Sequence, residues 1–132
     1  MSGVAVIRYM LANNSPLTAS VPAVRIMAGV LPINTTLPAI SVTQVSGMEA
    51  QMIKRSGTQL VTDRVQVTVL AATYPMQKSI LNLVRSAVVS TRGTVNTFSV
   101  DSITNEGDGP DLYNDDPVIY EQSIDFMVMF YR

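Results

Sequence analysis

Hydrophobic and polar residues alternate most regularly in the middle of the chain. Within residues 59–73, valine occupies every second position from 65 to 69, and polar side chains stand between the valines. In an extended strand, successive side chains point to opposite faces, so residues two positions apart share a face. This stretch is therefore predicted to be a β-strand with a buried valine face and a polar face that carries Arg64, Gln66 and Thr68.

Near the start of the chain, the hydrophobic residues instead follow helical spacing. Val4, Ile7 and Leu11 are three or four residues apart, and the sequence Asn-Asn-Ser-Pro at positions 13–16 is a stop signal. Residues 3–12 are therefore predicted to form a short amphipathic helix.

A second helix is predicted over residues 75–90, because Pro75 suits a first helical position and Arg92-Gly93 is a plausible end. The apolar side chains of this segment fall on one helical face. They are Met76, Ile80, Leu83, Val84, Ala87 and Val88.

The remaining hydrophobic runs predict strands. They cover residues 24–31, 39–45, 96–103 and 117–131. The stretches 17–23, 33–38 and 46–57 are predicted to connect them, and the Gly- and Asp-rich residues 105–116 are predicted to form a long hairpin turn. The expected order is α-β-β-β-α-β-β, which is a single α+β domain over residues 1–132 with a mainly antiparallel sheet and two helices packed on it.

Composition narrows the chemistry that this domain can perform. The 132 residues include no Cys and no His, so a thiolate nucleophile, a zinc finger and the usual general base near neutral pH are all excluded. No G-x-S-x-G elbow and no phosphate-binding P-loop occurs. We therefore expect a protein that is not an enzyme, with no catalytic, cofactor-binding or metal-binding residues.

The formal net charge of −1 hides a strong asymmetry. Residues 1–100 carry a net charge of +6, whereas residues 101–132 carry −7. Such a division is typical of a surface that meets a partner or a second copy of the chain. The alternative is that the acidic terminal segment folds over the basic body of its own chain.

Three groups of residues are candidates for a site. The carboxylates of Asp108, Asp111, Asp115 and Asp116 could bind a cation, but a solvated turn is the simpler interpretation because no EF-hand pattern is present. Lys54-Arg55 could contact phosphates or form an ordinary loop tip.

The third group comprises Met127, Met129 and Tyr131, on the face of the last strand that begins with the polar residues Ser123 and Asp125. An exposed apolar patch of this kind marks an interface. The alternative is that a helix or the N-terminal segment covers it. Glu121 and Asp125 share the same face. A polar, exposed strand face accounts for these two carboxylates better than a role in acid–base catalysis does.

No targeting signal and no membrane-spanning run is evident, so we expect the protein to be made and assembled in the cytoplasm.

Three stretches together resemble a known family. The run VRI…P in residues 24–32, LPAISV in 37–42 and RVQVTVLAATY in 64–74, continued by Ile80, Leu83, Val84 and Arg85, resembles the small tail-completion proteins of tailed bacteriophages. The likeness covers most of the chain and depends on apolar spacing with a few fixed letters. The family comprises tail terminators, also called tail-to-head joining proteins.

The resemblance implies a structural virion protein at the neck end of a phage tail. In that family an α+β subunit forms a six-membered ring that caps the tail tube, ends its polymerisation and joins it to the neck or head-completion proteins. The partners implied are further copies of the chain, the tail tube protein, the neck protein, the sheath protein if the tail is contractile, and genome DNA as it passes through the lumen. The family has no catalytic residues.

A ring requires a contact between two different faces of the subunit. We expect the segment from Asp108 to Asp116 to approach Lys78, Arg85 or Arg92 of a neighbour, Lys54-Arg55 to dock on the tube or neck, and Arg64 to face the lumen. The nearest alternatives are a tail-tube protomer and a neck adaptor. From a different class, a small metal-dependent hydrolase and a ligand-binding domain remain open.

Overall fold

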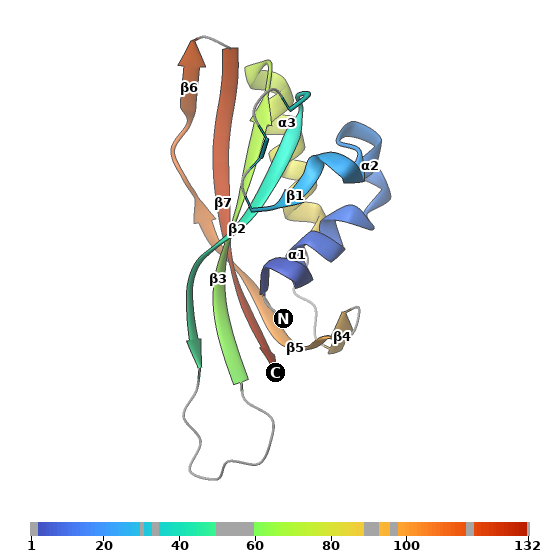
Figure 1. Ribbon diagram of the computed structural model, residues 1–132, viewed down its shortest axis with the longest axis vertical. Helices are drawn as coiled ribbons and strands as arrows, with labels where there is room; N and C mark the ends of the chain where they lie inside the picture. Colours follow the sequence, from blue (N-terminus) through green and yellow to red (C-terminus); the bar gives the residue numbers. More distant parts are fainter. Residues whose placement is uncertain are drawn as a thin grey trace.

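A computed structural model describes residues 3–29, 31–32, 35–49, 60–88, 93–95, 98–115 and 118–131 (Figure 1). The helices are α1 (Gly3–Ala12), α2 (Ser15–Ser20), the 3₁₀ turn η1 (Ala23–Arg25) and α3 (Tyr74–Ala87). The strands are β1 (Ile26–Ala28), β2 (Ala39–Glu49), β3 (Leu60–Ala71), β4 (Gly93–Val95), β5 (Phe98–Asp108), β6 (Leu112–Asp115) and β7 (Val118–Tyr131).

The described strands form one sheet in the order β1-β2-β3-β7-β5-β4, and β6 pairs with the first residues of β7. Only β1 and β2 pair in parallel; the other described pairs are antiparallel. In Figure 1, α1, α2 and α3 all lie on one side of the sheet. The prediction of an α+β domain with a mainly antiparallel sheet is confirmed.

The centre of the sheet is the pair β3–β7, which runs in unbroken register from Leu60 opposite Tyr131 to Ala71 opposite Tyr120. Along β3, burial alternates as the valine pattern predicts, with the valine side chains facing the helices. Phe126 and Phe130 of β7 are the largest fully buried side chains on the same face. The core therefore lies between this face and the helices.

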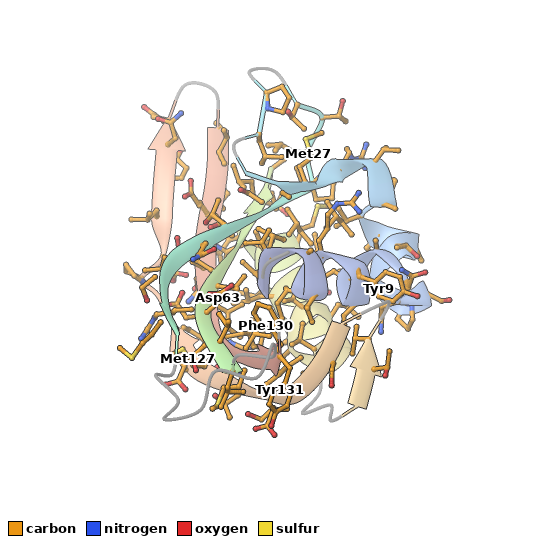
Figure 2. All side chains as sticks on the ribbon, turned by 60° about the horizontal axis from the view of Figure 1, so that its bottom comes forward. Tyr9, Met27, Asp63, Met127, Phe130 and Tyr131 are labelled. Carbon is orange, nitrogen blue, oxygen red and sulfur yellow. The ribbon has the colours of Figure 1, made fainter. Side chains whose placement is uncertain are left out.

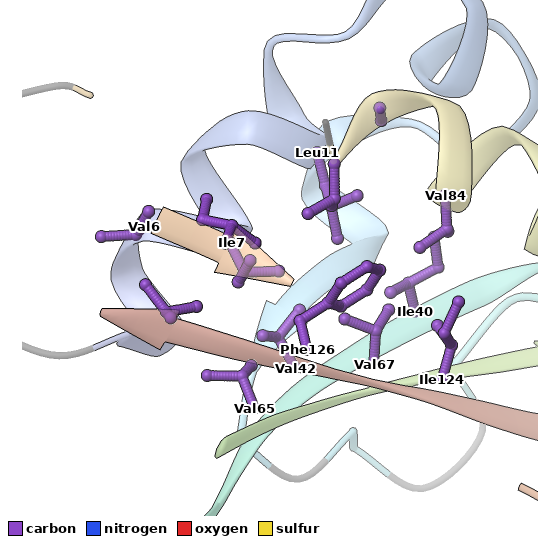
Figure 3. Packing of buried hydrophobic residues seen from close by; sticks show 14 of the residues in the cluster. Val6, Ile7, Leu11, Ile40, Val42, Val65, Val67, Val84, Ile124 and Phe126 are labelled. Atoms are coloured by element: carbon purple, nitrogen blue, oxygen red, sulfur yellow. The ribbon is translucent and has the colours of Figure 1, made fainter. Parts of the chain in front are cut away.

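The first helix packs as predicted, with Ile7 and Leu11 buried against the sheet and Val4 at the margin of the core. In Figure 3, Phe126 of β7 lies among Leu11 of α1, Ile40 of β2 and Val84 of α3. Side chains from both ends of the sequence thus share one core.

The apolar face of α3 is rotated from the one predicted. The buried positions begin at Gln77 and continue through Ile80, Leu81 and Val84, whereas Met76 is exposed and Leu83 is half-buried. Hydrophobicity alone would place Met76 rather than Gln77 in the core. The buried positions of α3, however, are spaced three or four residues apart from Gln77 onward, and Met76 falls outside that face. The prediction for Met76 is wrong.

Residues 15–20 form a third helix, where the prediction was a stop signal and a connector. Asn14 caps α2, because its side-chain oxygen accepts a hydrogen bond from the Leu17 N–H at 3.0 Å, and Pro16 lies in the first turn. The same residues that end α1 therefore begin α2, and Leu17 is buried beneath it.

Several strand boundaries also differ from those predicted. Among the described residues of the predicted strand 24–31, Ile26–Ala28 form β1, and Val24 and Arg25 belong to η1 instead. Strand β2 continues to Glu49 through a bulge at Val45, and β4 was not predicted. The predicted loop 33–38 and the connection 46–57 lie partly outside the described residues.

The largest difference concerns the acidic segment, which was predicted to be a long turn. Strand β5 extends to Asp108, and β6 continues in line with it as the second partner of β7. The interruption falls at Pro110, which has no N–H for the ladder, while the Gly109 N–H still bonds to the Ser123 carbonyl at 2.7 Å. Gly107, at a bulge in β5, has a φ of 108°, a conformation that favours glycine.

Candidate assembly surfaces

No described helix covers the face of the sheet opposite α1, α2 and α3 (Figure 1). This bare face presents the polar side of β3 and the alternate side chains of β7, all of them half-buried. Its central members are Thr62, Arg64, Gln66, Thr68, Ser123, Asp125, Met127 and Met129.

Arg64 forms an ion pair on this face with Asp125, at 3.0 Å between Nε and Oδ2. The hydroxyls of Thr68 and Ser123 are 2.9 Å apart on the same two strands. The centre of the face is therefore polar and internally bonded, as expected from the alternation in β3, and Glu121 adds a carboxylate for which no ion pair is found within the described residues.

Met127 and Met129 lie on the bare face, and Tyr131 ends β7 at the edge of the structure (Figure 2). Their neighbours on adjacent strands are polar, since Met127 stands between Arg64 and Thr104 and Met129 stands between Thr62 and Ser102. Within the described residues, no helix lies over them. Their part in an interface stays a prediction.

Lys78 of α3 joins the helix to the β5–β6–β7 edge. Its ammonium group donates to Asp111 Oδ1 at 2.7 Å and to Gln122 Oε1 at 2.5 Å, and it lies 5.0 Å from the centre of the Tyr74 ring. The Gln122 side chain in turn donates to the Gly109 carbonyl at 2.8 Å. These bonds fasten the interruption between β5 and β6 to the helix.

We call the bonds of Lys78 to Asp111 and Gln122 the Lys78 strap. Within it, Lys78 and Asp111 shift each other's pKa. The hydrogen bond from Lys78, aided by one from the Tyr74 hydroxyl, holds the pKa of Asp111 below its ordinary value of 3.8. The same bond to Asp111 raises the pKa of Lys78 above 10.5. Both groups therefore keep their charges across the neutral range.

Arg85 of α3 pairs with Asp108 at the end of β5. Lys78 and Arg85 thus meet acidic residues of their own chain, in agreement with the alternative that the acidic segment folds over the basic body. Lys54, Arg55, Arg92 and Asp116 lie outside the described residues. No group of three or more acidic side chains in the described part is placed to hold a metal ion.

Aromatic residues cluster where the β6–β7 hairpin leaves the sheet. The ring centres of Tyr113 and Tyr120 are 4.9 Å apart, and Tyr74 of α3 meets Tyr120 edge-on at 6.0 Å. The Tyr113 hydroxyl donates to Asp115 at 3.1 Å, and this bond raises the pKa of Tyr113 above 10.0. The sequence pattern missed this cluster because it depends on pairing β6 with β7.

No described helix is long and apolar enough to cross a membrane.

Comparisons with known proteins inform the fold. No family model matches the chain, and no curated protein matches it. Among solved structures, the chain is similar to one from the "Virion of native gene transfer agent (GTA) particle", with a TM-score of 0.71 and 11% identity. The likeness covers 99% of this chain and 96% of that chain, so the two share one fold over their full lengths.

Proposed function

We propose that this chain is a structural subunit of a phage-type virion, and that it acts there as a tail terminator. Its copies form a ring that caps the tail tube, ends tube polymerisation and joins the tail to the neck. The resemblance to tail-completion proteins implies that the ring is hexameric. The observation that carries the proposal is the full-length likeness in fold to a chain of a virion particle. The sequence resemblance to tail-completion proteins supports the finer assignment.

The arrangement of the sheet supports assembly into a ring. Strand β1 lies at one end of the strand order, and β6 extends the opposite edge beyond β5. Edges that differ in sequence can meet only by a heterologous contact, which closes into a ring when the rotation allows. Open strand edges also invite pairing with another chain.

The bare face suits the lumen of such a ring. Because Arg64 is paired with Asp125, this face would present hydroxyl, amide and thioether groups and the Glu121 carboxylate to the DNA, rather than a continuous basic surface. A surface with few unpaired cations binds DNA phosphates weakly and lets the genome slide. Lys54-Arg55 remains our candidate for docking on the tube or neck protein.

The proposal also accounts for the composition. A chain without His or Cys lacks the common means of acid–base and thiolate catalysis, which an assembly protein does not need. The virion would contain the protein at the neck end of the tail, after assembly in the host cytoplasm.

Electron microscopy and native mass of the purified protein test the proposal. Closed single rings that bind the ends of tail tubes are expected. Long tubes would instead identify a tube protomer, and rings that bind only head or neck proteins would identify a neck adaptor. A monomer that binds neither tubes nor necks would contradict a virion role and favour a ligand-binding domain, or a hydrolase if it turned over substrate with added magnesium.

A further inference from the structure

The β6–β7 hairpin carries an exposed patch that mixes apolar and acidic side chains. The register places Tyr113 opposite Tyr120 and Asp115 opposite Val118, so these side chains share one face of the hairpin. Tyr113 is 55% exposed and Val118 is 45% exposed. We call Tyr113, Asp115 and Val118 the hairpin patch.

A second group of exposed and half-buried side chains lies on α1 and on η1, the turn that leads into β1. Val24 of η1 is 77% exposed, a high fraction for a large aliphatic side chain, and Tyr9 of α1 is 39% exposed. Arg8 holds this region together, because its Nε donates to the Ile26 carbonyl at 3.0 Å. We call Arg8, Tyr9, Val24 and Arg25 the anchor patch.

The charges left over after folding are opposite in the two patches. Arg64, Lys78 and Arg85 each pair with a carboxylate of their own chain. Among the residues that the structure describes, no ion pair involves Arg8 or Arg25, and the buried Nε of Arg25 has no hydrogen-bond partner.

In the hairpin patch, the carboxylate of Asp115 bonds to the Tyr113 hydroxyl and forms no ion pair within the described residues. Asp115 is thus one of several described acids without an ion pair, since Asp101, Glu106 and Glu121 form none either, whereas both described guanidinium groups without an ion pair lie in the anchor patch.

The positions of the patches favour contact between two copies. In Figure 1 the hairpin stands at one side of the molecule, and α1 and α2 stand at the other. Figure 2 likewise places Tyr9 on the flank away from the hairpin. Two hairpin patches facing each other would bring like charges together, whereas a hairpin patch on an anchor patch brings opposite charges and apolar side chains together.

We propose that the hairpin patch of one copy docks on the anchor patch of the next copy, and that this head-to-tail contact closes the ring. The inference rests on the proposed ring function and names its subunit interface. Tyr113 and the two arginines are residue types that dominate binding energy at interfaces. In this contact, each patch binds the complementary patch of another copy of this chain.

Two variants with exposed substitutions test the contact. Val24→Glu places a negative charge in the anchor patch, and the double variant Tyr113→Ser with Val118→Ser removes the apolar part of the hairpin patch. Each is expected to raise the concentration needed for half-assembly by about ten-fold or more. Val45→Glu is the matched control, because Val45 is 53% exposed on β2 and lies in neither patch.

Mixing the two variants gives a sharper result. Each variant retains the patch that the other lacks, so a mixture can form one intact contact and should give a dimer by native mass spectrometry. A mixture that stays monomeric would overturn the proposal. So would variants that assemble at the wild-type concentration, or a Val45→Glu control that assembles as poorly as Val24→Glu.

The absence of cysteine provides an independent test. A chain with Val24→Cys and Val118→Cys should give a ladder of covalent multimers on oxidation, and a chain with Val45→Cys and Val118→Cys should not. If the wild-type chain assembles but no ladder forms, this interface is wrong while the ring function stands. If the wild-type chain is monomeric, both proposals fail.

Discussion

Asp63 is a carboxylate on the helix-facing side of β3, where the neighbouring inward positions are valines. Its Oδ2 accepts a hydrogen bond from the Gly3 N–H at 2.8 Å, so a residue from the sheet satisfies the first turn of α1 (Figure 2). The negative charge of Asp63 also interacts favourably with the positive N-terminal end of the α1 dipole. A Cβ at position 3 would stand 2.8 Å from the Asp63 Cβ, so glycine allows this close approach.

We predict that Asp63→Ala lowers the free energy of unfolding by about 1–3 kcal/mol, because the Gly3 N–H loses its acceptor in a buried setting. Asp63→Asn should lose less, since the amide oxygen can still accept the bond. Urea denaturation followed by circular dichroism measures both changes. Equal midpoints for Asp63→Ala and the wild type would refute the capping role.

Gln77 presents the opposite case, a buried amide without a hydrogen bond. Its side chain is fully buried on α3, and neither Nε2 nor Oε1 has a hydrogen-bond partner in the described part of the chain. Burial of an unsatisfied amide is unfavourable. This position therefore reduces the stability of the isolated chain.

Replacing Gln77 with Met, which has a similar shape, should raise the free energy of unfolding by about 1–2 kcal/mol. Gln77→Glu should lower it, because a carboxylate would then be buried without a partner. Thermal unfolding of the three proteins gives the comparison, and a Met variant less stable than the wild type would contradict it.

At the scale of elements, the Lys78 strap joins α3 to the interrupted edge strand β5–β6. The pKa of Asp111 is lower in the folded chain, so its stabilising contribution is present above pH 3.8 and is lost as pH falls through the folded value. The pKa of Lys78 is raised, so its contribution is present below pH 10.5 and is lost as pH rises through the folded value. The strap therefore holds across the range between these limits.

An Asp111→Asn variant should exchange the amide hydrogens of β6 faster than the wild type at neutral pH. This difference in exchange rate should shrink as pH falls below 3.8 through the folded pKa of Asp111, because the protonated wild-type carboxyl is then uncharged like the amide. Glu106→Gln, on the neighbouring strand β5, is the control for removal of a negative charge. A difference that persists unchanged at low pH would show that Asp111 does not act through its charge.

The elements show which features can be predicted from a sequence. Strand β3 was predicted closely because the alternation of valine at every second position reports burial directly. Strand β6 was not predicted, because Gly107, Gly109 and Pro110 are turn formers, yet the residues on either side of Gly109 and Pro110 pair with β7. The strap and the tyrosine cluster depend on such pairings between distant segments, which a single sequence pattern does not contain.

At the scale of the whole molecule, one core joins both ends of the chain. Strand β3 lies between β2 and β7, and α1 packs on the same face as α3. Because the N-terminal helix and the C-terminal strand share buried side chains, neither has a separate core. The chain should therefore unfold in a single transition.

We predict that Phe126→Ala lowers the free energy of unfolding by about 3–5 kcal/mol. Hydrogen exchange in α1 and in β5 should accelerate by the same factor, because the two regions open together. Different factors in the two regions would indicate separately unfolding units. The exposed substitution Val45→Ser should leave both rates close to those of the wild type.

The tyrosine cluster has a practical consequence. The chain has five tyrosines and no tryptophan, so tyrosine dominates its intrinsic fluorescence. Three of these residues (Tyr74, Tyr113 and Tyr120) stand together at the hairpin, and Tyr9 lies in the anchor patch. Tyr9 and Tyr113 belong to the two patches proposed to meet, and Tyr120 packs directly on Tyr113, so the intensity and anisotropy of the light emitted by the unlabelled protein can follow assembly in real time.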